Sequence, residues 1–204
     1  LVAKVPLVIV THPSVPSRDV KEFIALARSN PGKLTYGSAG NGSSNHLIGE
    51  MFKAAAGVRI VHIPYKGGAP AMVALMSGEL DMMVGQVPSV ATQVKAKRVR
   101  ALAIAGAKRS QALPDVPTLI ESGLPGFDAT SWYAIVAPAG TPKPIVEKLH
   151  AELVKAINSS EVRGRLSDEG AEIETTTPDQ LAAFVRKEID KWAQAVKISG
   201  AKLD

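Results

Sequence analysis

Residues 34–46 decide the fold of the chain around them and read Leu34-Thr-Tyr-Gly-Ser-Ala-Gly-Asn-Gly-Ser-Ser-Asn-His46. The short apolar run at 34–36 predicts a strand, the glycines and serines of 37–43 predict a loop, and residues 45–56 have the apolar spacing of a helix. Glycines let successive backbone amides turn toward one point, and the helix that follows adds its own unsatisfied N–H groups. Such a loop suits a carboxylate or a phosphate.

The order of strand, loop and helix continues on both sides of this stretch. Strands that alternate with short helices argue for an α/β protein with a mostly parallel sheet flanked by helices. Further strands are expected at 7–10, 59–64, 80–84, 99–105, 131–137 and 171–174, and further helices at 19–29, 69–77, 89–96, 144–158, 160–168 and 178–199.

Two C-terminal helices carry apolar stripes, and the stripe of helix 178–199 is expected to be buried. In helix 144–158 the stripe has a four-residue spacing, and in helix 178–199 it follows Thr177, the expected N-cap. The stripes consist of Ile145, Leu149, Leu153 and Ile157, and of Leu181, Val185, Ile189, Trp192 and Val196.

Two more junctions follow predicted strands. Tyr65, Lys66, Gly67 and Gly68 offer a hydroxyl, a positive charge and backbone amides, and Gly85-Gln-Val-Pro88 follows the next strand. In an open parallel sheet these junctions and the glycine-rich loop lie at the same edge, where ligands bind. We therefore expect an anion site there; the alternative for each loop alone is an ordinary capped turn.

Composition excludes several classes of protein. With 204 residues, 46% hydrophobic and 21% charged, the chain can bury a core of its own. Its net charge is +5, but the basic residues are scattered and only 4% of residues are aromatic. The densest basic cluster, Lys95, Lys97, Arg98 and Arg100, is interpreted as a solvated helix end, so no nucleic acid partner is expected.

Cofactor and metal sites are not expected either. The chain has no cysteine, which excludes disulfides, thiolate zinc sites and cysteine nucleophiles. No pair of histidines has metal-ligand spacing, and the G-x-x-G-x-G loop matches neither a dinucleotide fingerprint nor a P-loop.

The histidines argue against an enzyme. His46 follows Ser43 by three residues, which fits two capping groups at a helix start better than a catalytic pair, and a G-x-S-x-G elbow is missing. His62 lies in an apolar strand and is expected to be a satisfied interior histidine, whereas His150 is expected on a polar helix face. The rival hypothesis is a hydrolase that uses the loop from Ser38 to His46 as its anion site.

Four motifs, in order along nearly the whole chain, resemble one family. They are YGSAGNG at 36–42, VHIPYKGGAP at 61–70, the segment 102–110 with LPDVP at 113–117, and WYAIVAPAGTPKP at 132–144. These motifs resemble the Bug family, the TctC-like extracytoplasmic solute receptors of tripartite tricarboxylate transporters.

This resemblance implies a two-lobed, type II-like periplasmic binding fold, a small carboxylate ligand and delivery to a membrane permease. A ligand-sensing receptor module is the alternative. Carried over by position, the ligand-binding residues would be Ser38, Ala39, Gly40, Asn41, Gly42, Ser43, Ser44, His46, Tyr65, Lys66, Gly67, Gly68 and Gln86. Gly85-Gln86 stands where the family often has Asp-Asn.

The resemblance also divides the chain. Residues 1–12 would be a hinge strand and remnant of the first lobe, 13–130 the second lobe, and 131–204 a hinge strand and helices that return to the first lobe. Because the first residue is Leu1 and the family's initial α/β segment has no counterpart, we expect the first lobe to be partial. Its exposed apolar face should be buried, for instance in a homodimer.

Overall fold

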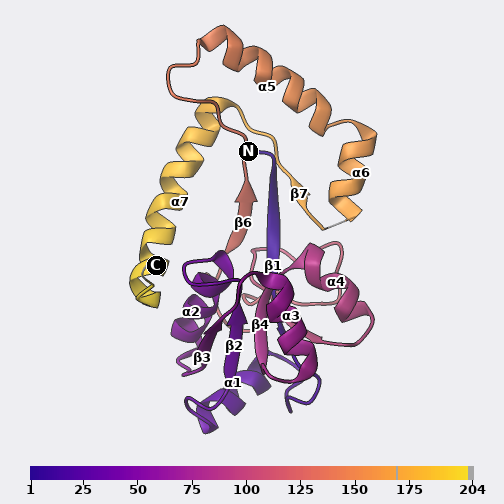
Figure 1. Cartoon of the computed structure of the whole chain (residues 1–204), viewed down its shortest axis with the longest axis vertical. Helices are drawn as coiled ribbons and strands as arrows, with labels where there is room; N and C mark the ends of the chain where they lie inside the picture. The colour runs from indigo at the N-terminus through magenta and orange to yellow at the C-terminus, as the bar shows by residue number, and fades with distance from the viewer. Residues whose placement is uncertain (169, 202–204) are drawn as a thin grey trace.

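One long strand, β1 (Ala3–Thr11), runs through the middle of the molecule and joins its lower and upper parts (Figure 1). The computed structural model describes residues 1–168 and 170–201. The C-terminal half of β1 pairs with β4 (Met82–Gln86) and β5 (Arg100–Ile104), and its N-terminal half pairs with β6 (Thr130–Tyr133) and β7 (Glu172–Ile173). β1 is therefore the strand that the two parts share.

The lower sheet has the strand order β3-β2-β4-β1-β5. β2 (Thr35–Ser38) is parallel to both of its neighbours, β3 (Val61–Pro64) and β4, as the alternation of strands and helices predicted. β1 departs from that expectation, because it is antiparallel to β4 and β5. The helix that follows it, α1 (Val20–Ser29), lies at the bottom of the sheet in Figure 1, so β2 runs opposite to β1.

Helices cover both faces of this sheet. Alternate residues of β1 point to opposite faces: Leu7 and Ile9 pack in one cluster with residues of α1 and α2 (Ser44–Ala56). Val8 and Val10 pack in a second cluster with residues of α3 (Gly68–Ser77) and α4 (Val87–Lys95). The lower part thus has its own core on each side of the sheet, which holds the helix N-termini at its upper edge in fixed positions.

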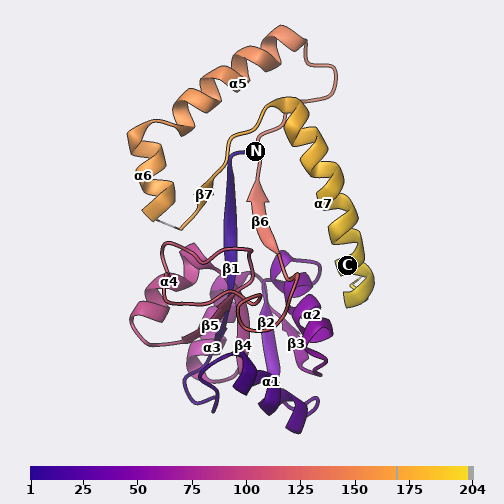
Figure 2. The ribbon, with the colours of Figure 1, turned by 180° about the vertical axis from the view of Figure 1, so that it is seen from behind.

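Three further helices form the upper part of the molecule (Figure 2). α5 (Lys143–Ile157) lies at the far end from the lower sheet, α6 (Ser160–Asp168) leads back toward that sheet, and α7 (Pro178–Ser199) returns alongside α2. The predicted N-cap is confirmed, because Thr177 and Gln180 form a reciprocal capping box at the start of α7. Across 1–168 and 170–201, none of the helices combines the length and apolarity that a membrane span requires.

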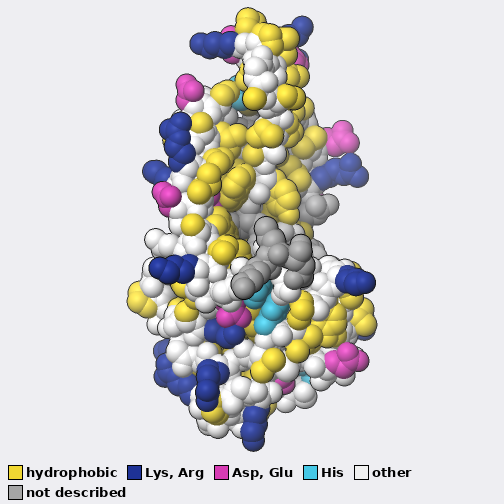
Figure 3. All heavy atoms as spheres, turned by 60° about the vertical axis from the view of Figure 1, so that its left-hand side comes forward, with side chains coloured by type: hydrophobic (Ala, Val, Ile, Leu, Met, Phe, Trp, Pro, Cys, Tyr) yellow, Lys and Arg dark blue, Asp and Glu magenta, His cyan; other side chains and the backbone are white. Residues whose placement is uncertain are grey.

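The expected burial of the stripe on α7 is largely wrong, and the stripe on α5 is partly uncovered as well. Ile145 and Leu149 of α5 are about half exposed, at 51% and 50%, and Ile189 of α7 is 62% exposed. In α7 the buried residues are Glu188 and Ala195. Periodicity marked the apolar faces correctly, but the described residues offer little to cover them (Figure 3).

Two local expectations also change. The strand expected at 131–137 ends at Tyr133, where its pairing with β1 ends. In the basic cluster, Lys95, Lys97 and Arg98 are exposed, but the Arg100 guanidinium donates to the carbonyls of Val15 and Ser17 at 3.1 and 2.6 Å. Arg100 therefore stabilises the segment that follows β1, and the prediction of a solvated helix end is wrong for this residue.

Candidate functional site

The carboxyl ends of β2, β3 and β4 lie side by side, and a helix begins after each of them. Ser38 is paired in register with Pro64 of β3, and Gly37 with Met83 of β4. α2, α3 and α4 follow these three strands. Because each helix N-terminus carries free N–H groups and a partial positive charge, this edge favours a bound anion.

The first two junctions are joined through their backbones. The Tyr65 amide donates to the carbonyl of Ser38 at 3.1 Å, and the Gly67 amide donates to that of Ala39 at 3.2 Å. Gly40 has a φ of 126°, and a Cβ atom there would lie 3.4 Å from the Tyr65 carbonyl oxygen. Residues 39–43 and 65–67 therefore form one continuous, glycine-lined surface.

The third junction differs from the loop expected at 85–88. β4 continues to Gln86, and α4 begins at Val87 with Pro88 in its first turn. The Gln86 side chain donates from Nε2 to the Tyr133 hydroxyl at 2.9 Å, which connects the sheet edge to β6. Tyr133 is half exposed and was not among the predicted site residues, because nothing in its sequence spacing marks it.

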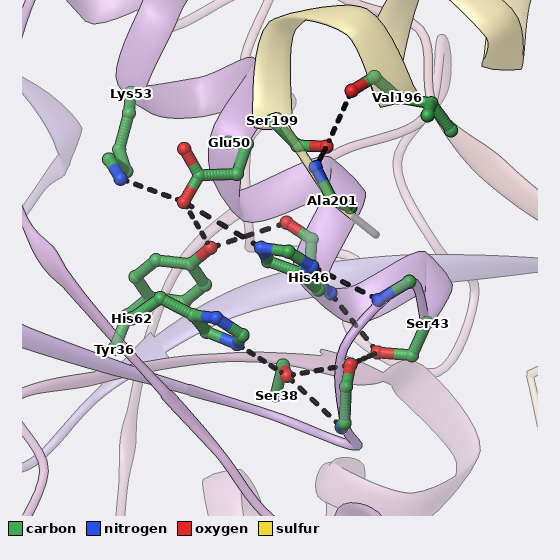
Figure 4. A network of polar contacts seen from close by, with 12 residues as sticks. Tyr36, Ser38, Ser43, His46, Glu50, Lys53, His62, Val196, Ser199 and Ala201 are labelled. Carbon is green, nitrogen blue, oxygen red and sulfur yellow. Dashed lines mark hydrogen bonds and ion pairs between the residues drawn. The ribbon is translucent and has the colours of Figure 1, made fainter. Parts of the chain in front are cut away.

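The glycine-rich loop is folded on its own hydrogen bonds. Ser43 is the N-cap of α2: its Oγ accepts from the His46 amide at 3.3 Å and donates to the Gly40 carbonyl at 2.7 Å. The Gly42 amide donates to Nδ1 of His46 at 3.1 Å. His46 is therefore the capping group that its spacing from Ser43 predicted, and its ring lies beneath the loop (Figure 4).

A second histidine supports the same loop. The rings of His46 and His62 stack with centroids 3.9 Å apart and planes 6° apart. Nε2 of His62 lies 2.7 Å from Oγ of Ser38, and that oxygen also accepts from the Gly40 amide at 3.1 Å. His62 thus has the polar partner expected of an interior histidine.

Charged groups of α2 complete the network. Glu50 accepts from the Tyr36 hydroxyl at 2.6 Å and forms an ion pair with Lys53 at 2.7 Å. Burial, followed by the contact with Glu50, raises the pKa of Tyr36 well above its ordinary value. Burial lowers the pKa of His46, and burial together with neighbouring His46 lowers the pKa of His62 to about 4. Both rings are therefore neutral at neutral pH.

The predicted site residues fall into three groups by exposure. Asn41 and Lys66 are exposed, whereas Ser38 and His46 are buried and act on the loop from below. The others are half-buried around the shared edge: Ala39, Gly40, Gly42, Ser43, Ser44, Tyr65, Gly67, Gly68 and Gln86. Sequence reasoning missed Glu50, whose position one turn after His46 is the only signal that could have identified it.

This arrangement suits binding better than catalysis. The Ser38 hydroxyl is fully buried and is bonded to His62 rather than to His46, so a substrate cannot reach it as a nucleophile. Among residues 1–168 and 170–201, no group of three His, Asp or Glu side chains is placed to hold a metal ion. The amides of Gly40, Gly42 and Gly67 donate within the protein, so the edge favours an anion through the positive ends of α2 and α3 and through Lys66.

Comparisons with known proteins point the same way. The family described as tripartite tricarboxylate transporter family receptor matches residues 1–200. Protein BugT of Bordetella pertussis is 37% identical over 203 residues, which cover 100% of this chain and 62% of BugT. The chain therefore spans about three fifths of the length of that curated relative.

Two solved structures with named ligands are also similar. Rpa4515 of R. palustris with adipate superposes with a TM-score of 0.90 at 34% identity, covering 98% of this chain and 67% of that protein. MatC (Rpa3494) from Rhodopseudomonas palustris with bound malate superposes with a TM-score of 0.83 at 34% identity. The superposition covers 95% of this chain and 67% of MatC. Both likenesses extend over nearly all of the present chain.

Proposed function

We propose that this chain, which belongs to the tripartite tricarboxylate transporter receptor family, captures a small carboxylate at the shared edge of β2, β3 and β4. Its family consists of solute-binding receptors and not of enzymes. The observation that carries the proposal is the continuous backbone surface of residues 39–43 and 65–67 at the N-termini of α2 and α3. The amides of Gly40, Gly42 and Gly67 donate within the protein and shape this surface, which lies at the positive ends of two helices, where a carboxylate is favoured.

The ligand class follows from the chemistry of the edge and from the relatives. Lys66 adds a positive charge beside the glycine amides, and Gln86 and Tyr133 add polar groups at the third junction. Adipate and malate, which the two solved relatives bind, each have two carboxylates. A small dicarboxylate with one end on loop 39–43 is therefore the proposed ligand of this chain.

The second carboxylate needs a second lobe. We propose that residues 13–130 form one lobe, that 1–12 and 131–204 cross the hinge and begin the other, and that the remainder comes from further sequence such as the longer relatives have. Residues 169 and 202–204 of this division lie outside the described residues. The long strand β1, shared by both sheet regions, supports this division.

An apolar groove marks where the remaining part of that lobe would pack. It has a volume of about 630 Å³ and lies between α5, the start of α7 and the segment 135–141. Further sequence of a longer protein would cover this groove and complete the lobe. A second copy of the chain is the alternative occupant when the 204-residue chain is studied alone.

The proposed setting is the periplasm, with delivery of the ligand to a membrane permease. Support comes from the family description and from solved relatives that are periplasmic proteins. A receptor that only senses its ligand would use the same loops. Among the described residues, we find no feature that favours sensing over transport.

Calorimetry with adipate, malate and citrate tests the proposal, with the neutral diamide of adipic acid as the control ligand. Each charge-assisted hydrogen bond contributes about 1.5–3 kcal/mol, so two or three of them, less the entropy lost on capture, give roughly millimolar affinity to this chain alone. Equal binding of adipate and its diamide, or binding of none of the acids, would contradict the proposal.

A matched pair of glycine variants locates the site. Gly40→Ala places a Cβ against Tyr65 at a φ of 126° and should weaken acid binding by about tenfold or more. Gly123→Ala is the control, because that glycine also has a positive φ, 100°, but meets nothing within 4 Å. Equal affinity in the two variants would place the ligand elsewhere.

A further inference from the structure

We propose that His46 and His62 are positioning residues of the carboxylate loop, residues 38–43. As a neutral stacked pair they hold this loop in its ligand-binding conformation, and their protonation in acid disrupts that conformation. The inference rests on the proposed carboxylate site and adds its regulation by pH. Neither ring is assigned a contact with the ligand. Both act through the backbone that they support.

His46 can support the loop only while it is neutral. Its Nδ1 accepts the hydrogen bond from the Gly42 amide at 3.1 Å, so the ring proton of the neutral form is on Nε2. An imidazolium has a proton on both nitrogens and cannot accept this bond. Protonation would therefore set two donors against each other and push residue 42, which has a φ of 72°, away from the helix start.

His62 fixes the other end of the loop. It lies 2.7 Å from the Ser38 hydroxyl, which is fully buried and braces Gly40 through both its amide and its carbonyl. Because its ring is stacked 3.9 Å from that of His46, a charge on one ring opposes a charge on the other. The stack therefore favours the state in which both rings are neutral.

The surrounding charges decide where the rings titrate. Among the described residues, α2 contributes Glu50, whose Oε1 lies 4.0 Å from Nε2 of His46, and Lys53, and β2 contributes the Tyr36 hydroxyl. The end of α7 passes beside them with Ser199 and Ala201, which do not titrate (Figure 4). Glu50 favours protonation of His46 and Lys53 opposes it, but burial outweighs both and lowers the pKa of each ring.

The direction of the pH response follows from these shifts. Both rings are neutral at neutral pH, so the loop has its full binding shape there. As pH falls, both rings gain protons only below the ordinary histidine value of 6.5, and His62 does so at about 4. Ligand affinity should therefore fall in acid. A merely electrostatic role would give the opposite result, because a positive ring attracts a carboxylate.

A measurement without ligand tests the support itself. NMR of the ring nitrogens should show His46 with its proton on Nε2, and the Gly42 amide should lose hydrogen-exchange protection as the ring titrates. His46→Leu should lose this protection at every pH, whereas His46→Asn, whose Oδ1 can accept the same bond and takes no proton, should retain it in acid. A proton on Nδ1 at neutral pH, or unchanged protection in His46→Leu, would overturn the inference.

Calorimetry with adipate at about pH 7.5 and about pH 5 tests the consequence. The wild-type chain should lose about tenfold more affinity than His46→Asn, the cost of about one hydrogen bond. Protonation of adipate itself affects both proteins equally, so the difference belongs to the ring. His150→Asn on α5 is the control and should respond as the wild type does.

The outcomes separate the two proposals. Equal pH responses of the wild type and His46→Asn, or tighter binding of adipate in acid by the wild type alone, would overturn the role of the histidines and leave the carboxylate site standing. Gly42 protection that follows the prediction, with no adipate binding at any pH, would support the histidine role and contradict adipate as the ligand. The ring titration of the wild type needs no variant, so a variant that fails to fold does not prevent the test.

Discussion

At the scale of single residues, the close approach of α2 to β2 depends on Gly49. A Cβ atom at this position would lie 2.8 Å from Cζ of Tyr36, which is fully buried. Gly49→Ala should therefore overpack the site and lower the free energy of unfolding by about 1–3 kcal/mol. Urea unfolding measures this loss.

Gly164→Ala is the control for that substitution. Gly164 lies within α6, and a Cβ there would meet nothing within 4 Å. In a helix, alanine is favoured over glycine by about 1 kcal/mol, so this variant should be neutral or slightly stabilised. Similar urea midpoints for Gly49→Ala and Gly164→Ala would show that the Tyr36 ring moves aside without a loss of stability.

The buried His46 and the half-buried His62 also make the stability of the fold depend on pH. Because the pKa of His62 is lowered to about 4 in the folded chain, the unfolded chain binds more protons between about pH 4 and pH 6.5. The contribution of His62 is therefore fully present above pH 6.5 and is lost as pH falls toward 4. His62→Gln should flatten this part of the curve of unfolding free energy against pH. A slope equal to that of the wild type would contradict the burial of a neutral ring.

At the scale of elements, one carboxylate anchors α7 to β6. Oε2 of Glu188, which is 8% exposed, accepts from Nε1 of Trp132 on β6 at 3.0 Å and from Nε1 of Trp192 on α7 at 2.8 Å. Oε1 of Glu188 pairs with Lys191 at 2.7 Å. Trp192 also packs on the core that contains residues of α1 and α2. α7 therefore contacts both β6 and the core that α1 and α2 cover.

Glu188→Gln should weaken this anchor, because the amide nitrogen cannot accept a bond and the ion pair with Lys191 is lost. The expected cost is about 1–3 kcal/mol of unfolding free energy. Since the chain has 2 tryptophans and both donate to this carboxylate, tryptophan fluorescence should change as well. Asp190→Asn, an exposed position on the same helix, is the control. An unchanged fluorescence spectrum and an unchanged unfolding midpoint in Glu188→Gln would show that Glu188 does not stabilise the packing of α7.

The bounds of the helices and strands could largely be predicted from local sequence patterns. The contacts between distant elements could not. The bounds expected for α6 and α7 agree with the structure, and Ser43 and Thr177 cap their helices as expected. The pairing of Ser38 with His62 could not be predicted, because these residues are 24 positions apart and meet only when β2 and β3 pair. Spacing along the chain drew attention to Ser43 and His46 instead.

At the scale of the whole molecule, the apolar groove beside α5 should govern how the chain behaves alone. Exposed apolar surface of this extent favours association, and we expect the 204-residue chain to self-associate at high concentration. Leu149→Lys, at a groove residue that is 50% exposed, should weaken that association by about tenfold or more. Light scattering over a range of concentrations measures it.

Ala151→Lys is the matched control, because it adds the same charge to an exposed position of α5 outside the groove. It should associate as the wild type does. A wild-type chain that stays monomeric at every concentration would rule out a second copy as the occupant of the groove.

The sequence by itself determined the alternation of strands and helices, the helix caps and the glycine-rich loop, because these depend on hydrogen bonds and side-chain periods among near neighbours. Only the tertiary structure decided that β1 enters antiparallel, that two histidines stack beneath the loop, and that the stripes of α5 and α7 stay largely uncovered. Each of these depends on which distant segments pack together. An apolar period shows that a face is available for burial, but many partners could bury it equally well.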